Sequence, residues 1–367
     1  MKIVHMVASL KGGGIQNLIL SLVPEQVRLG HEVSVIVTDE DNLAYSNKNK
    51  EFLQNSGVSV YNLDRKVSDK ISFFKTWIAA RRLVGKLHPD IVNSHGIYCH
   101  NASSFAVFGK SIKHCCTIHS APEKWGWLPK IMNYNVPLIF CSDAALQLRG
   151  QSSKMMVAVN NGIELNRIRV SETVDLHEEL GIPQEDKIVV LVGSTRPQKN
   201  YSFLIKIVEK MQDEHVHFCI CGGEYKVNRK GGNNNMYISL DEFKKYRNIH
   251  LLGLRNDVPA VLNGADAYLS CSVREGLPIS ALEGFFSGIP CVLSPILQHT
   301  NIAGGIAQCY IPKAFEPQSF IKSIYQAVNT DCSHDVIYES RKETLKKFLI
   351  DRCAKEYIEF YEKILNK

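Results

Sequence analysis

Short apolar runs and longer amphipathic segments alternate along the chain in two successive series. The first series has apolar runs of a length typical of buried strands, at 2–7, 32–37, 58–63, 90–94, 115–118 and 137–141. The second series has candidate strands at 187–192, 215–221, 249–252, 267–271 and 289–293, and candidate helices near 201–212, 257–264, 278–287 and 316–328. This repeated alternation predicts an α/β protein with two Rossmann-like, doubly wound domains.

A polar stretch at residues 160–183 separates the two series. It begins with Asn160-Asn161-Gly162, a typical turn sequence. The 367 residues exceed one ordinary compact core, so we predict a first domain at 1–165 and a second at 166–345. Residues 346–367 carry the amphipathic pattern of a final helix.

Two carboxylates mark the loop and helix that follow the predicted strand at 267–271. Glu275 lies in the segment Ser272-Val-Arg-Glu-Gly-Leu-Pro278, and Glu283 lies two turns along the helix that Pro278 begins. Loops at the carboxyl ends of parallel strands bind ligands in open α/β sheets, and helix amino termini favour anions. Both glutamates can therefore face one polar, hydroxyl-rich ligand, although solvated surface charge is the ordinary fate of glutamate.

The stretch from Gly253 through Glu275 and Glu283 to Gly288-Ile-Pro290 resembles the donor site of the retaining family 4 glycosyltransferases, whose signature is two glutamates separated by seven residues. The resemblance implies the GT-B fold, in which two Rossmann-like domains face each other across a cleft. The first domain then binds the acceptor and the second binds the nucleotide-sugar. The final helix crosses back to the first domain.

The resemblance also assigns roles to residues. Glu275 contacts the transferred sugar and Glu283 binds the ribose. Further donor contacts come from the same loop and from the turn that holds the base, at Gly276, Leu277, Pro278, Leu254 and Arg255. The implied reaction is the retaining transfer of a sugar, as by a hexosyltransferase, from a UDP-sugar to an acceptor hydroxyl. It requires no metal and no cofactor.

A cationic segment, Ser194-Thr-Arg196-Pro-Gln-Lys199-Asn200, follows the first strand of the second series. Cations there can neutralise a diphosphate leaving group. The family usually has an arginine at the position of Ser194. Lys199 fits the family pattern, whereas Arg196 would have to supply its guanidinium from a different direction or point into solvent.

A glycine-rich loop, Lys11-Gly12-Gly13-Gly14, follows the first strand and opens a helix. Such a loop lets the backbone approach a phosphate or an acceptor, so Gly13 and Gly14 are candidate ligand contacts. Asp39 follows the second strand, where a nicotinamide-dependent dehydrogenase would hold a ribose. Asn17 at the third position of the dinucleotide fingerprint speaks against that enzyme class.

Histidines end two strands of the first series. His119 resembles the family histidine near the transferred sugar, which makes it a candidate catalytic residue, and His95 is a candidate on the acceptor side. Both lie in a segment that is also rich in cysteine. None of the 11 cysteines has the paired Cys-x2-Cys spacing of a zinc site. We therefore expect reduced thiols and no metal.

The residues after Pro290 differ from the glycine-rich loop and glutamate common in the family. This chain reads Ser294-Pro-Ile-Leu-Gln-His299, so donor phosphate contacts cannot be transferred from the family to this loop.

The positive charge lies in the first half, where 20 Lys and Arg residues stand against 12 Asp and Glu within residues 1–170. Residues 65–86 form a cationic, amphipathic helical pattern, which fits an anionic membrane surface or ordinary packing on the sheet. No nucleic-acid binding signature accompanies the charge. The amino terminus enters a strand and no apolar run spans a bilayer, so we expect a cytoplasmic protein, peripheral on the inner face of the cell membrane.

The expected partners are therefore a nucleotide-sugar and a glycan or lipid-linked acceptor, as in bacterial capsule or O-antigen synthesis. Two alternatives remain. A UDP-sugar 2-epimerase of the same fold would need no acceptor, and a non-catalytic glycan- or lipid-binding protein would keep the fold without the chemistry.

Overall fold

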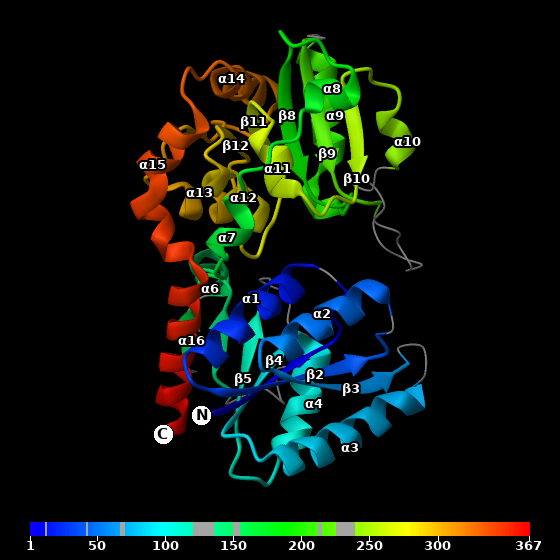
Figure 1. Ribbon diagram of the computed structural model, residues 1–367, viewed down its shortest axis with the longest axis vertical. Helices are drawn as coiled ribbons and strands as arrows, with labels where there is room; N and C mark the ends of the chain where they lie inside the picture. The colour runs from blue at the N-terminus through cyan, green and yellow to red at the C-terminus, as the bar shows by residue number, and fades with distance from the viewer. Residues whose placement is uncertain are drawn as a thin grey trace. The chain divides into compact units, whose positions relative to one another are not determined.

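The computed structural model describes residues 1–11, 13–41, 43–66, 70–119, 136–149, 155–211, 215–224 and 239–367. The chain divides into two compact units. The first comprises Met1–Glu164 and Lys347–Lys367, and the second comprises Leu165–Lys346. The sequence places these divisions after residues 165 and 345. Each unit has its own parallel sheet (Figure 1).

The sheet of the first unit has seven parallel strands in the order β3-β2-β1-β4-β5-β6-β7. The strands are β1 (Lys2–Val7), β2 (Glu32–Asp39), β3 (Ser59–Arg65), β4 (Ile91–His95), β5 (Lys113–Ile118), β6 (Leu138–Phe140) and β7 (Met156–Ala158). The inner strands β1 and β4 are buried over nearly their whole length, as expected of a parallel sheet covered on both faces.

Helices connect these strands and cover the sheet. They are α1 (Gly14–Arg28), α2 (Ala44–Asn55), α3 (Lys70–Leu87), α4 (Ile97–Val107), α6 (Asp143–Arg149) and α16 (Ile350–Leu365). The carboxyl-terminal helix α16, red in Figure 1, packs beside α1. It buries Tyr357 and Tyr361 completely, and the Tyr361 hydroxyl accepts a 2.7 Å hydrogen bond from Asn93 Nδ2 of β4.

The sheet of the second unit has six parallel strands in the order β10-β9-β8-β11-β12-β13. They are β8 (Lys187–Val192), β9 (Val216–Cys221), β10 (Ile249–Gly253), β11 (Ala267–Ser270), β12 (Cys291–Leu293) and β13 (Cys309–Tyr310). The strand order reverses between β8 and β11, and the loops that follow these two strands open at the point where α/β sheets bind ligands.

The helices of the second unit are α7 (Leu165–Ile168), α8 (Leu176–Leu180), α9 (Tyr201–Met211), α10 (Leu240–Phe243), α11 (Val258–Asn263), α12 (Ile279–Ser287), α13 (Leu297–Ala303), α14 (Pro317–Val328) and α15 (His334–Leu345). Two short 3-10 turns lie at Pro197–Lys199 and Lys346–Phe348. The apolar face of α9 packs with α14 in the core of this unit.

Most predicted elements are present, with ends shifted by a few residues. Helices at α9, α11, α12 and α14 match the four predicted ranges closely. The pattern missed β7 and β13, which are two or three residues long. Both strands are only partly buried, whereas β6 and β12, which are three residues long, are fully buried and lie within predicted runs.

Candidate functional site

The principal candidate site lies in the second unit, at the carboxyl ends of β8 and β11. The loop after β8 ends in the 3-10 turn Pro197–Lys199, and Asn200 terminates that turn with a φ of 53°. The loop after β11 leads to Pro278, which caps the amino terminus of α12. The Val273 amide donates a 2.9 Å hydrogen bond to the Gln198 carbonyl. The two loops are therefore held together directly.

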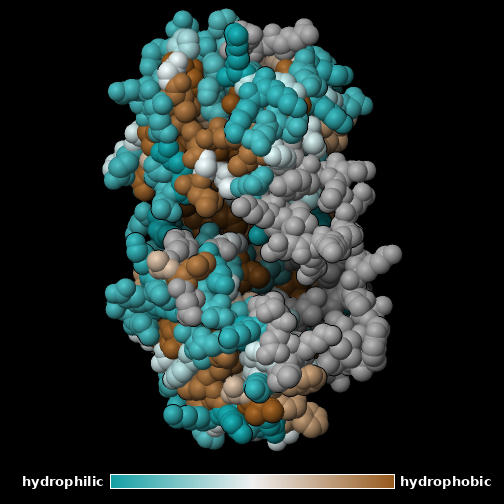
Figure 2. All heavy atoms as spheres, turned by 90° about the vertical axis from the view of Figure 1, so that its right-hand side faces the viewer, coloured by the Kyte–Doolittle hydropathy of each residue, from teal (hydrophilic) through white to brown (hydrophobic). Residues whose placement is uncertain are grey.

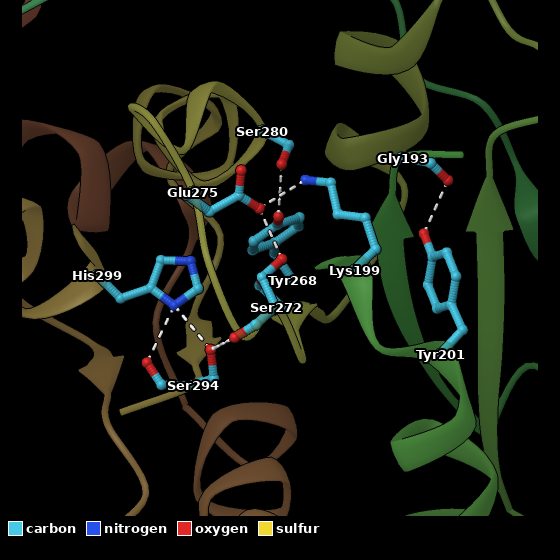
Figure 3. A network of polar contacts seen from close by, with 10 residues as sticks. Gly193, Lys199, Tyr201, Tyr268, Ser272, Glu275, Ser280, Ser294 and His299 are labelled. Carbon is cyan, nitrogen blue, oxygen red and sulfur yellow. Dashed lines mark hydrogen bonds and ion pairs between the residues drawn. The ribbon is translucent and has the colours of Figure 1, made fainter. Parts of the chain in front are cut away.

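Lys199 and Glu275 meet where these loops touch. Lys199 Nζ lies 2.8 Å from Glu275 Oε1, and Ser272 Oγ donates a 2.6 Å hydrogen bond to the same oxygen (Figure 3). The side chains are only 18% and 9% exposed. Since water screens such a pair weakly, the attraction is stronger than at an open surface. The sequence places both residues in the site, and the structure brings them into contact.

The charge state of Glu275 follows from its surroundings. Burial acts to raise the pKa of this carboxyl, but the Lys199 charge and the hydrogen bonds from Lys199 and Ser272 outweigh burial and lower it. Glu275 is therefore a carboxylate at neutral pH, with a cation beside it.

Glu283 has the opposite electrostatic balance. It lies in α12, where burial raises the pKa of its carboxyl to about 7, although the charges of Lys199 and Arg167 act to lower it. Lys199 is thus the leading electrostatic partner of both glutamates. The Lys199 ammonium group is in contact with Glu275 and acts electrostatically on Glu283.

Glycines shape the loop after β8. A Cβ on Gly222 would lie 1.9 Å from the Gly193 carbonyl oxygen, so side chains are excluded where the ends of β8 and β9 approach each other. Gly193 has a φ of 146°, and its carbonyl accepts a 2.8 Å hydrogen bond from the Tyr201 hydroxyl. This packing sets the path of the chain into Lys199. The sequence analysis did not select Gly222 or Tyr201, because only the tertiary contact reveals their role.

His299 of α13 is a further residue that the sequence analysis left without a role. Its Nδ1 lies 3.0 Å from both the backbone oxygen and Oγ of Ser294, and Ser294 Oγ donates to the Ser272 carbonyl. Burial lowers the pKa of His299 to about 4, although the Glu275 charge acts to raise it. Nδ1 therefore carries the proton of a neutral ring, and His299 braces the loop that presents Glu275.

The remaining donor-side residues are placed as follows. Leu254 is 87% exposed, and Arg255 forms ion pairs with Glu179 and Asp257 at 2.6 Å and 2.7 Å. The Asp257 hydrogen bond is the main reason that the pKa of Arg255 is raised. The Arg255 guanidinium is therefore engaged within the unit, whereas the Leu254 side chain of this turn is open to a ligand. Arg196 is exposed, whereas Leu277 is buried beneath the Glu275 loop.

The glycine loop of the first unit is partly described, since Gly12 lies outside the described residues. Gly13 has a φ of 126°, and Gly14 begins α1. Asp39 is bound to Arg65 of β3, with Oδ1 lying 2.6 Å from the guanidinium. Because this carboxylate is occupied, it is poorly placed to hold the ribose of a nicotinamide cofactor.

His95 and His119 are in direct contact in the first unit, with His95 Nδ1 lying 2.9 Å from His119 Nε2. The structure thus joins two candidates that are 24 positions apart in the sequence. The neighbouring His114 hydrogen bonds to Ser94 at 3.0 Å. Within the described ranges, no three His, Cys, Asp or Glu residues cluster in a way that could hold a metal ion. The expectation of metal-free chemistry stays a prediction.

Two family models match the chain. Residues 12–163 match the model described as Glycosyltransferase Family 4, and residues 173–343 match Glycosyl transferases group 1. A UDP-galactose: α-D-GlcNAc-diphosphoundecaprenol α-1,3-galactosyltransferase of Escherichia coli is 24% identical over 216 residues. That match covers 57% of this chain and 54% of the relative, so the chain spans about half the length of that protein.

Solved glycosyltransferase structures share the fold over the full chain. A glycosyltransferase from Rickettsia africae superposes with a TM-score of 0.78 at 15% identity and covers 100% of this chain and 99% of its own. HepE from Anabaena, solved with UDP and glucose, gives a TM-score of 0.78 at 15% identity, with coverage of 99% and 100%.

The fold, the paired glutamates and the two matching models define one class of protein. The chain belongs to the family 4 glycosyltransferases. Its two Rossmann-like α/β domains are of the GT-B type.

Proposed function

We propose that the protein transfers a sugar from a UDP-sugar to an acceptor hydroxyl with retention of the anomeric configuration, and without a metal. The observation that carries this proposal is the 2.8 Å ion pair between Lys199 and Glu275 at the carboxyl edge of the second sheet, with Glu283 buried in the helix that follows and lying within the influence of the Lys199 charge. The structural neighbour solved with UDP and glucose supports the choice of donor.

Each charged residue has a role that its surroundings support. Lys199 neutralises the departing diphosphate, helped by the amino terminus of the nine-residue helix α12. Glu275, held as a carboxylate, orients the transferred sugar. Glu283 accepts hydrogen bonds from the ribose hydroxyls. Binding of the diphosphate draws Lys199 away from Glu275, so the ion pair in the ligand-free protein prepares the cation for its substrate.

Bond making and breaking take place on one face of the sugar. The bond from the anomeric carbon to the diphosphate oxygen breaks, and a bond to the acceptor oxygen forms on the same side. The leaving phosphate oxygen takes the acceptor's proton. Neither Glu275 nor Glu283 has to form a covalent intermediate in this scheme.

An acceptor carried on a membrane lipid fits the surface of the first unit. Residues 70–113 hold seven Lys or Arg and one Asp, a net charge of +6 within one segment. Four apolar side chains of α3, α4 and the following turn are exposed, at Phe74, Ile78, Phe105 and Phe108. Figure 2 shows apolar surface gathered beside polar surface over these elements. Exposed aromatics flanked by cations are the chemistry of an anionic bilayer surface.

The described helices offer no membrane-spanning segment, since none is both long and apolar enough to cross a bilayer. We propose that the protein works as a peripheral protein at the inner face of the cell membrane. There it would add a sugar to a lipid-linked oligosaccharide in capsule or O-antigen synthesis. The Escherichia coli relative, whose named acceptor is GlcNAc-diphosphoundecaprenol, supports this role.

Calorimetric titration of the purified protein with UDP, GDP and NAD tests the donor assignment. UDP should bind, and Glu283→Ala should abolish that binding. Binding of NAD alone, or of no nucleotide, would overturn the proposal. Release of UDP from a UDP-sugar that depends on an added lipid-linked acceptor then separates a transferase from a 2-epimerase of the same fold, since an epimerase needs no acceptor.

A further inference from the structure

Three buried imidazole rings form a continuous hydrogen-bonded chain through the first unit. Nδ1 of His5 in β1 lies 2.9 Å from Nε2 of His95 in β4. His95 Nδ1 lies 2.9 Å from Nε2 of His119, directly after β5. These strands are neighbours in the order β1-β4-β5, which brings the three rings into one line across the sheet. His5 and His95 are almost completely buried, and His119 is partly exposed.

The inner end of the chain is fixed by an amide. Gln26 Oε1 of α1 lies 2.8 Å from His5 Nε2, and an amide oxygen can only accept a hydrogen bond. Gln26 is fully buried and lies beside Tyr361 of α16. His5 Nε2 therefore carries a proton that it donates to Gln26.

All three rings are neutral at neutral pH. Burial lowers the pKa of His5 and of His119 to about 4 each. Burial lowers the pKa of His95 well below its ordinary value, and the repulsion that a protonated His119 or His5 would exert lowers it further. In the described part of the chain, these rings hydrogen bond only to one another and to Gln26, with no contacting carboxylate or ammonium group.

The tautomers then follow in series. A neutral ring has one N–H and one lone pair. Since His5 Nε2 is protonated, His5 Nδ1 accepts from His95 Nε2, and His95 Nδ1 accepts in turn from His119 Nε2. His119 Nδ1 is left with a lone pair at the outer end of the chain.

We propose that Gln26, His5 and His95 are positioning residues that hold His119 in the Nε2–H tautomer, so that its Nδ1 accepts a hydrogen bond from a substrate hydroxyl. This inference rests on the proposed function, and on the resemblance that makes His119 a candidate contact of the transferred sugar. An isolated imidazole in water exchanges between tautomers, whereas reversing one ring here requires all three rings to reverse. The chain therefore commits His119 to accept rather than donate.

Nitrogen-15 NMR of the protein labelled at histidine measures the tautomers independently of activity. The His5→Asn and His119→Asn variants assign the signals. We expect Nε2–H and a bare Nδ1 on His5, His95 and His119. A protonated Nδ1 on His119 would overturn the proposal even if the enzyme transfers sugar. Failure of UDP binding with the expected tautomers would instead count against the proposed function alone.

Gln26→Met replaces the amide acceptor with an apolar side chain of similar size. It should give mixed tautomers on all three rings and reduce turnover about tenfold. His100 and His114, stacked 4.9 Å apart elsewhere in the same unit, are the internal control and should not change. Unchanged tautomers in folded Gln26→Met would sink the positioning role.

Discussion

Lys199 and Glu275, 76 positions apart in the chain, form a 2.8 Å ion pair that joins the loop after β8 to the loop after β11. Ser272 hydrogen bonds to the same carboxylate oxygen. Since both side chains are largely buried, each charge depends on the other for its compensation.

Replacing Lys199 should therefore destabilise the second unit. Lys199→Met leaves Glu275 without its cation and should lower the free energy of unfolding by about 3 kcal/mol, measured by urea denaturation. Lys187→Met is the matched control, because the Lys187–Asp266 pair is 42% and 26% exposed and should cost less than about 1 kcal/mol. Equal effects of the two variants would contradict a special role for the buried pair.

The same variant tests catalysis. Lys199→Met should lower turnover at least about tenfold through loss of charge at the diphosphate. The double variant Lys199→Met with Glu275→Gln should recover stability, since the unpaired carboxylate is gone, but no turnover.

UDP binding should strengthen with pH through the titration of Glu283. The pKa of this carboxyl lies at about 7, so below pH 7 it must lose a proton before it accepts both ribose hydroxyls. Affinity for UDP, measured by calorimetry from pH 6 to pH 8, should rise and then level off. Glu283→Gln should remove the contribution of this group to the slope, and an identical pH dependence in the variant would exclude it as the titrating group.

Folding stability, unlike UDP affinity, should fall as pH rises through the titration of Glu283. Burial raises the folded-state pKa of Glu283 from 4.5 to about 7. The contribution of its protonated form to folding stability is therefore fully present below pH 4.5 and is lost as pH rises through 7. Glu283→Gln should remove this decrease from a plot of the free energy of unfolding against pH.

His299 should act as a brace and not as an acid. Its Nδ1 hydrogen bonds to Ser294 at 3.0 Å, so His299→Leu should cost about 1–3 kcal/mol of unfolding free energy. Because the pKa of His299 lies near 4, the ring stays neutral and the pH profile of turnover between pH 6 and pH 8 should keep its shape. A profile that shifts in the variant would show that His299 titrates during the reaction.

The membrane surface of the first unit can be tested with vesicles that contain anionic phospholipid. Phe74→Ser and Phe108→Ser each remove an exposed ring and should weaken partitioning about tenfold. Val336→Ser is the matched control, because Val336 is 59% exposed in the second unit. If all three variants bind vesicles as the parent protein does, the surface is not the docking site.

Chelation should leave the reaction intact. In the proposed scheme Lys199 supplies the positive charge that a divalent cation would otherwise bring to the diphosphate, so EDTA should not change turnover with a UDP-sugar. A loss of activity that Mn²⁺ restores would contradict the metal-free scheme.

Much of the architecture is readable from the chain because its signals are local. An apolar run defines a buried strand and a 3.6-residue period defines a helix face, so α9, α12 and α14 fall where the pattern predicts them. The pairing of Glu275 with Glu283 is likewise a matter of spacing along one loop and helix.

Contacts between distant segments could not be predicted in this way. Nothing in the sequence says that Gly222 must lack a side chain to clear Gly193, that His299 supports the Ser272 loop, or that Gln26 terminates a chain of three histidines. Each of these relationships joins residues from separate elements, and only the order of strands in the sheet brings them together.

The sequence by itself determined the fold class and the two βα series, since these depend on periodicity, and its resemblance to the family 4 glycosyltransferases supplied the residues of the candidate donor site. Tertiary structure alone decided which charges are paired, which carboxyl holds its proton near neutrality, and which nitrogen of His119 is free. Those properties depend on burial and on distances of a few ångströms between atoms far apart in the chain, which no local pattern encodes.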